Sequence, residues 1–110
     1  MIQDRIAKIE AALKGAGNLP EETRAELLAL LAELKAEVAP LTETHDEDAQ
    51  SIAHFAGASV HEATRTARKP DQADAALKGL TSSVEGFEVS HPRLVEIVNR
   101  IAVALSNMGI

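Results

Sequence analysis

Two histidines and a glutamate are the residues whose types and spacing come nearest to a metal site. Glu47, His54 and His61 follow one another at steps of seven. A carboxylate and two imidazoles suit a divalent metal ion. Residues seven apart on one straight helix, however, lie about 10 Å apart along its axis, and helical metal motifs use spacings of three or four. The spacing favours a solvated polar face, and the three residues remain the candidates for a metal or small-molecule site.

Ser90 and His91 are the second pair to consider, because a serine and a histidine can serve as nucleophile and general base. Adjacent side chains project in different directions, which does not suit the geometry of a catalytic triad. Ser90 instead matches a helix N-cap, with Pro92 in the first turn that follows. Thr44 and Glu47 match a capping box at the start of the predicted helix that contains His54 and His61. Capping leaves the His91 side chain without an assigned role.

Other signatures of catalysis or cofactor binding are missing from the sequence. There is no cysteine, and the Gly15-Ala16-Gly17 stretch lacks both a following glycine and a preceding strand. The acidic run at 43–48 lacks the ligand pattern of an EF-hand. We therefore predict no enzymatic activity, no catalytic residue and no cofactor.

Charge and hydropathy narrow the range of partners. The net charge is −6 and aromatic residues make up 2% of the chain, which argues against a nucleic-acid partner. No stretch approaches the roughly 20 apolar residues of a membrane span, and the N-terminus lacks the apolar core of a signal peptide. We predict a soluble, cytoplasmic protein without a membrane partner.

The elements that must position these residues are all predicted to be helices. Apolar residues recur at steps of three and four, and alternating strand patterns are missing. The third helix has a stripe mostly of alanine and is interrupted by Gly57, which makes it the weakest. The fifth is apolar over about half its circumference and is expected to be central. The predicted helices cover about 2–14, 20–39, 45–68, 71–87 and 91–108.

These helices predict a single all-α domain over residues 1–110. It is expected to be a compact bundle of four to five helices, with an N-terminal hairpin and a C-terminal helix pair. Gly109 and Ile110 are expected to close the last helix in a Schellman motif, with Ile110 docked against Leu105.

The amount of apolar helix surface predicts a function in protein–protein interaction. The fifth helix and the leucine-rich second helix together carry more apolar surface than a chain of 110 residues is expected to bury, and exposed apolar patches usually mark interfaces. We expect self-association into a homodimer first, with an unidentified protein partner as a further possibility. The alternative is a protein that binds a small molecule or a divalent metal through Glu47, His54 and His61.

Two C-terminal motifs are distinctive, namely FE-x-SHP-x-L, from Phe87 to Leu94, and L-x-NMGI, from Leu105 to Ile110. They resemble a small bacterial family, the domain of unknown function DUF4404. The resemblance implies an all-helical fold and supplies no activity, cofactor or catalytic residue. Family members tend to be shorter, so the resemblance also implies that residues 40–70 are an enlargement.

Overall fold

Five helices account for the regular structure of residues 1–108. The computed structural model describes residues 1–108, and each regular element within them is a helix, which confirms the all-α prediction. Pro70 and Pro92 each occupy a first helical turn, where a missing backbone N–H costs no hydrogen bond. The helices are α1 (Ile2–Gly15), α2 (Glu21–Leu41), α3 (Asp46–Thr64), α4 (Pro70–Ser82) and α5 (Pro92–Ser106).

Three helix ends differ from the prediction. Helix α2 continues through Pro40 to Leu41, whose buried side chain joins the core. Helix α3 ends at Thr64 because Arg65 is extended. Helix α4 ends at Ser82, and turns follow in which Gly86 has a φ of 95°, a conformation that favours glycine. Phe87 therefore belongs to the loop at 83–91 and not to α4.

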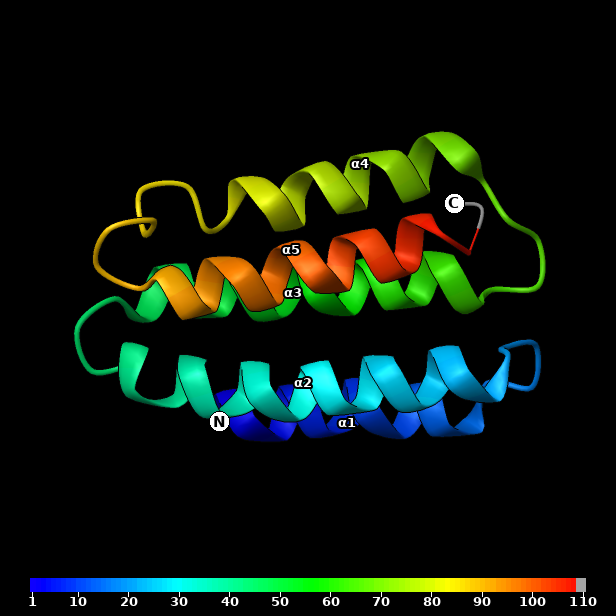
Figure 1. Cartoon of the computed structure of the whole chain (residues 1–110), viewed down its shortest axis with the longest axis horizontal. Coiled ribbons are helices and arrows are strands. Elements are labelled where there is room, and N and C mark those ends of the chain that lie inside the picture. The colour runs from blue at the N-terminus through cyan, green and yellow to red at the C-terminus, as the bar shows by residue number, and fades with distance from the viewer. Residues whose placement is uncertain (109–110) are drawn as a thin grey trace.

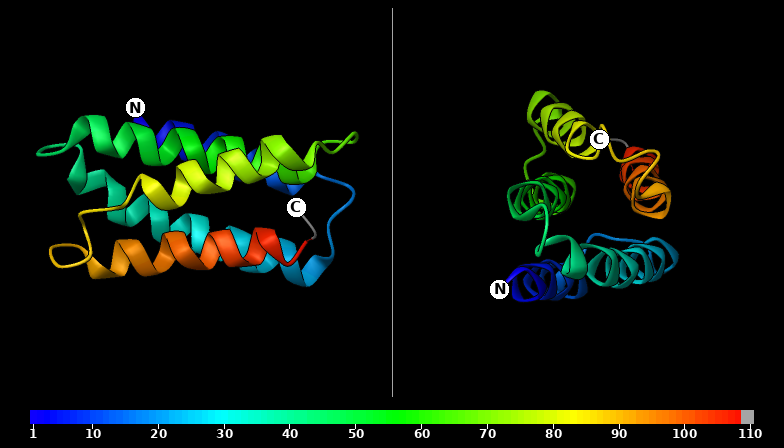
Figure 2. Two further views of the ribbon diagram at one scale, coloured as in Figure 1. Left: turned by 90° about the horizontal axis from the view of Figure 1, so that it is seen from above. Right: turned by 90° about the vertical axis from the view of Figure 1, so that its left-hand side faces the viewer.

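The helices run up and down along the long axis of the molecule, and each is antiparallel to the one before it (Figure 1). They form three layers, with α1 and α2 in the first, α3 and α5 in the second, and α4 covering the second from outside (Figure 2). The loops at 42–45 and 83–91 lie at the same end of the bundle. Residues far apart in the sequence can therefore meet there.

Aliphatic side chains fill the space between the layers. The radius of gyration is 12.9 Å, close to the roughly 13 Å of a compact domain of about this size. One continuous cluster of buried side chains joins all five helices. Its largest fully buried members are Ile6, Leu13, Leu27, Leu31, Leu34, Ile52, Leu80, Leu94, Ile101 and Leu105.

Helix α3, and not α5, contacts each of the other four helices. The expectation that α5 would be the central element was wrong in this respect, although α5 does pack against α2, α3 and α4. The alanines that made α3 look weak explain its position. Small side chains let neighbouring helices approach closely, and Ala49, Ala53, Ala56 and Ala63 are all buried. Gly79 of α4 lies directly against the ring of Phe55 in α3.

Polar contacts hold the predicted N-terminal hairpin together. Lys35 Nζ of α2 lies 2.8 Å from Glu10 Oε1 of α1. The Arg24 guanidinium, also from α2, donates hydrogen bonds to the carbonyl oxygens of Leu13 and Ala16. Leu13 is in the last turn of α1 and Ala16 is its C-cap residue, and the Leu13 carbonyl also accepts a hydrogen bond from the Ala16 N–H. Arg24 thus adds side-chain donors to the end of one helix from the start of the next.

Two further predictions concern the C-terminal residues and the absence of a membrane span. The predicted Schellman closure involves Gly109 and Ile110, which lie outside the described residues. None of the helices within residues 1–108 combines the length and the apolar character that crossing a bilayer requires.

Candidate functional site

The three candidate metal ligands lie on the exposed side of α3 but do not converge. Glu47, His54 and His61 are all exposed. Across residues 1–108, no group of three or more His, Cys, Asp or Glu side chains is placed to hold a metal ion. Their separation follows from the helix itself, which carries successive members of the set about 10 Å apart.

His54 and His61 instead line a shallow groove between α1 and α3. Its volume is about 430 Å³, and Arg5 and Lys8 of α1 contribute to the same wall. Arg5 donates a hydrogen bond of 2.9 Å to Gln50 of α3. Two positive side chains beside the imidazoles oppose binding of a metal cation. The structure therefore gives no support to a metal site on this face.

Ser90 does not cap α5, so the predicted N-cap was wrong. The N-cap residue is His91, and no side-chain capping bond forms. Because Pro92 takes the first helical position, the capping position belongs to the residue just before it, and Ser90 lies one residue too early. The Ser90 hydroxyl instead shares a hydrogen bond of 2.9 Å with Nδ1 of His91.

The same arrangement occurs at the start of α3, where the predicted capping box is also absent. His45 is the N-cap residue and makes no side-chain capping bond. The Thr44 hydroxyl lies 2.8 Å from Nδ1 of His45. The two N-cap residues have nearly identical backbones, with φ and ψ of −137° and 57° at His45 and −138° and 61° at His91. At the start of each of these two helices, a threonine or serine therefore precedes a histidine, and its hydroxyl forms a hydrogen bond to the histidine ring.

His45, His91 and Phe87 form a triangle of rings at one end of the bundle. The ring centroid of Phe87 lies 5.4 Å from that of each histidine, and the two histidines are 6.3 Å apart. All three pairs are edge-to-face, with interplanar angles of 77° to 79°. Phe87 is buried while His91 is half-buried and His45 exposed, so the imidazoles lie on the solvent side. We call these three residues the ring cluster.

Sequence reasoning missed one of the three members of the ring cluster. It singled out Phe87 and His91 but assigned no role to His45. The available signal was the repeated pair of a hydroxyl residue and a histidine immediately before a helix, Thr44-His45 and Ser90-His91. Only the fold shows that the two helix starts are neighbours.

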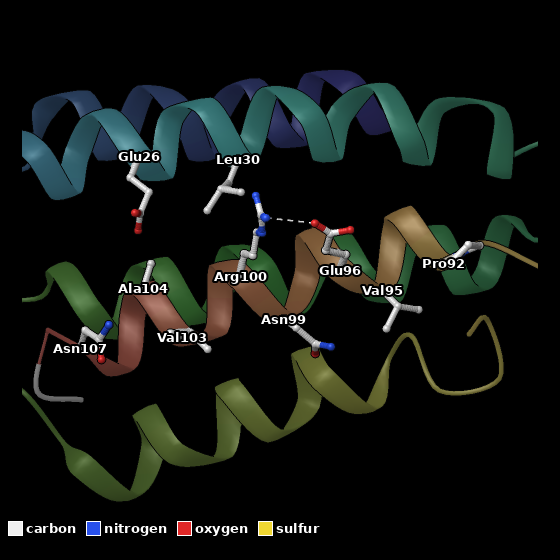
Figure 3. A pocket seen from close by; sticks show the side chains of 10 residues that line it. All are labelled: Glu26, Leu30, Pro92, Val95, Glu96, Asn99, Arg100, Val103, Ala104 and Asn107. Carbon is white, nitrogen blue, oxygen red and sulfur yellow. Dashed lines mark ion pairs between the residues drawn. The ribbon is translucent and has the colours of Figure 1, made fainter. Parts of the chain in front are cut away.

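A second surface feature lies over the outer side of α5. It is an open depression of about 680 Å³, lined by α5 and by Glu26 and Leu30 of α2. Figure 3 shows Ala104 between α5 and α2, while Val95 and Asn99 point toward α4. Val103 is 58% exposed in this depression, a high value for an apolar side chain in the middle of a helix. We call this surface the α5 face.

Comparison with known proteins identifies the family. The family described as "Domain of unknown function (DUF4404)" matches residues 27–110, most of the chain. No curated protein and no solved structure shows significant similarity. The match begins inside α2 and includes the ring cluster and all of α5. The chain is therefore a member of the DUF4404 family.

Proposed function

We propose that this protein functions through protein–protein interaction, and that its first partner is a second copy of itself bound at the α5 face. The observation that carries this proposal is the exposed Val103 in a depression whose apolar lining also includes the half-buried Val95 and the buried Leu30. Apolar surface gathered in one depression gains free energy when a partner removes it from water.

The structure corrects part of the sequence argument for this interface. The leucine-rich stripe of α2 is not available to a partner, because Leu27, Leu30, Leu31, Leu34 and Val38 are all buried in the core. The surplus of apolar surface is therefore smaller than the sequence suggested. Within the helices, the exposed large apolar side chain is Val103 of α5, which narrows the proposed interface to one helix and its flank on α2.

The charges on the α5 face suit a second copy of the chain. Glu96 and Arg100 form an ion pair of 3.1 Å one turn apart on this face. A two-fold symmetric interface pairs residue i with j and j with i. If the two-fold axis passes close to Glu96 and Arg100, Glu96 of each copy can lie against Arg100 of the other copy. The overall charge of −6 disfavours association through the acidic parts of the surface.

The size of the face sets the expected strength of the dimer. A helix of 15 residues is about 22 Å long. One such helix with a flank of α2 buries less than the roughly 800 Å² per partner of a standard interface. We expect a dimer with micromolar affinity. This role requires no catalytic residue, and we propose a non-enzymatic cytoplasmic protein.

Sedimentation equilibrium across the micromolar range tests the proposal. The wild-type chain should change from monomer to dimer with concentration, and Val103→Asp should remain monomeric because it places a charge in the apolar contact. Val89→Asp is the matched control. Val89 is 95% exposed in the loop at 83–91, so the same substitution there should leave dimerisation unchanged.

Charge exchange on α5 tests the orientation. Glu96→Arg alone should weaken the dimer, because it sets like charges against each other across the axis. The double variant Glu96→Arg with Arg100→Glu should restore it. A wild-type chain that is monomeric throughout, or a Val103→Asp variant that dimerises as well as Val89→Asp, would contradict the proposal.

A further inference from the structure

We infer that His45 and His91 together form a binding site for a divalent transition-metal ion at the end of the bundle. The site is independent of the α5 face and does not involve the predicted candidates on α3. It uses two imidazoles from separate loops that the fold brings side by side.

The separation of the two rings fits coordination of one ion. A metal at about 2.0 to 2.1 Å from Nε2 lies about 3.2 Å from the imidazole centroid, so two ligating rings have centroids at most about 6.4 Å apart. The observed separation of 6.3 Å is just within this limit and corresponds to a nearly linear arrangement of the two ligands. A tetrahedral angle at the metal requires about 5.2 Å by the same geometry. We therefore expect the exposed His45 ring to move about 1 Å closer to His91 when the ion binds.

The hydroxyl contacts supply the orientation that metal-binding histidines need. A ligating imidazole usually donates its other ring N–H to an oxygen, which fixes the ring and its tautomer. Here Nδ1 of His45 is 2.8 Å from the Thr44 hydroxyl, and Nδ1 of His91 is 2.9 Å from the Ser90 hydroxyl. When each Nδ1 donates to its hydroxyl, each Nε2 keeps a free lone pair. The same device occurs at both histidines.

The surroundings of the pair support this assignment. The Phe87 ring contacts both imidazoles edge-on and is buried, so it limits where the two rings can move. Both histidines are at the positive ends of helices, which disfavours a cation. At α3 this charge is offset by acidic residues in the first turn, namely Asp46, Glu47 and Asp48, whereas the first turn of α5 has none.

The ligand set selects the class of metal. Two neutral imidazoles with water in the remaining positions suit zinc, copper or nickel, and not magnesium or calcium, which prefer oxygen. Two protein ligands fix the ion less firmly than the three or four of a permanent centre. We therefore expect exchangeable binding of one ion per chain.

Titration of the full chain with zinc or nickel ions alone tests the inference. We expect saturable binding of one ion per chain and a higher melting temperature, because a ligand of the folded state stabilises it. His45→Gln and His91→Gln should each lose this binding. The other two histidines of the chain supply matched controls, and His54→Gln and His61→Gln should bind the metal as the wild type does.

NMR of the wild-type imidazoles covers the case in which a variant fails to fold. Metal should shift the ring signals of His45 and His91 and leave those of His54 and His61 in place. The double variant Thr44→Val with Ser90→Ala should bind at least tenfold more weakly, since it removes both orienting hydroxyls. Absence of saturable binding, shifts confined to His54 and His61, or undiminished binding by His91→Gln would overturn the inference.

Discussion

Ser59 shows what a single polar group contributes to the interior of this bundle. Its side chain is completely buried in α3. Among residues 1–108, the Ser59 hydroxyl oxygen is the buried side-chain nitrogen or oxygen atom that lacks a hydrogen-bond partner. Burying a hydroxyl without a partner costs free energy, in the range of about 1 to 3 kcal/mol by protein mutational data.

Ser59→Ala should therefore stabilise the protein. We expect a gain of about 1 kcal/mol in the free energy of unfolding, made up of the removed desolvation penalty and the better helix propensity of alanine. Ser51→Ala is the matched control, since Ser51 is exposed in the same helix and reports propensity alone. Urea denaturation of both variants makes the comparison. A gain no larger than that of Ser51→Ala would show that the Ser59 hydroxyl carries no penalty.

At the scale of helix pairs, Gly57 and Gly79 differ in how closely a side chain of the neighbouring helix approaches them. Both Gly57 of α3 and Gly79 of α4 lie inside helices, where glycine is unfavourable by about 1 kcal/mol relative to alanine. A Cβ atom on Gly57 would lie 3.4 Å from Ile9 of α1, an ordinary contact. A Cβ atom on Gly79 would overlap the ring of Phe55. Of these two positions, only position 79 requires a glycine, because the Phe55 ring lies too close for a Cβ atom.

Gly79→Ala should destabilise the protein while Gly57→Ala stabilises it. We expect a loss of about 1 to 3 kcal/mol for the first, because overpacking forces α3 and α4 apart, and a gain of up to about 1 kcal/mol for the second. Thermal unfolding followed by circular dichroism measures both. Adding Phe55→Ala to Gly79→Ala should cost less than the sum of the two single changes. Equal effects at the two glycines would refute the close-approach argument.

The helices themselves were predictable because each has a local cause in the sequence. Apolar residues at steps of three and four specified the buried faces, and Pro70 and Pro92 marked two helix starts. The dominant role of α3 was not predictable from its own composition. It depends on how closely α1 and α4 approach, and Gly79 meets Phe55 only after folding.

The candidate sites were less predictable for the same reason. Spacing along one helix could show that His54 and His61 are too far apart for one metal ion. It could not show that His45 and His91 are neighbours, since their proximity depends on the order in which five helices pack. The capping errors at Ser90 and Thr44 were local, each displaced by one residue from the true N-cap.

At the scale of the whole molecule, α1 has an unusual relation to the family. The family match begins at residue 27, inside α2, and so excludes α1 entirely. Yet α1 packs on both α2 and α3 and buries Ile2, Ile6, Ile9 and Leu13 in the common core. In this chain α1 is therefore part of the folded unit and not an appendage to it.

Deleting residues 1–19 should consequently abolish cooperative folding. The deletion removes five buried Ile and Leu side chains, including Leu19. Their burial contributes about 8 to 15 kcal/mol, comparable with the total stability of about 5 to 15 kcal/mol of a typical domain. We expect the shortened chain to keep helical signal, lose its sharp thermal transition and bind a dye for exposed apolar surface. A synthetic peptide of residues 1–19, added in excess, should restore the transition by mass action. The same peptide with Ile6→Asp and Leu13→Asp is the control and should not. If the shortened chain instead melts cooperatively near the full-length temperature, the region that matches the family is stable without α1. The other four helices would then form the core by themselves.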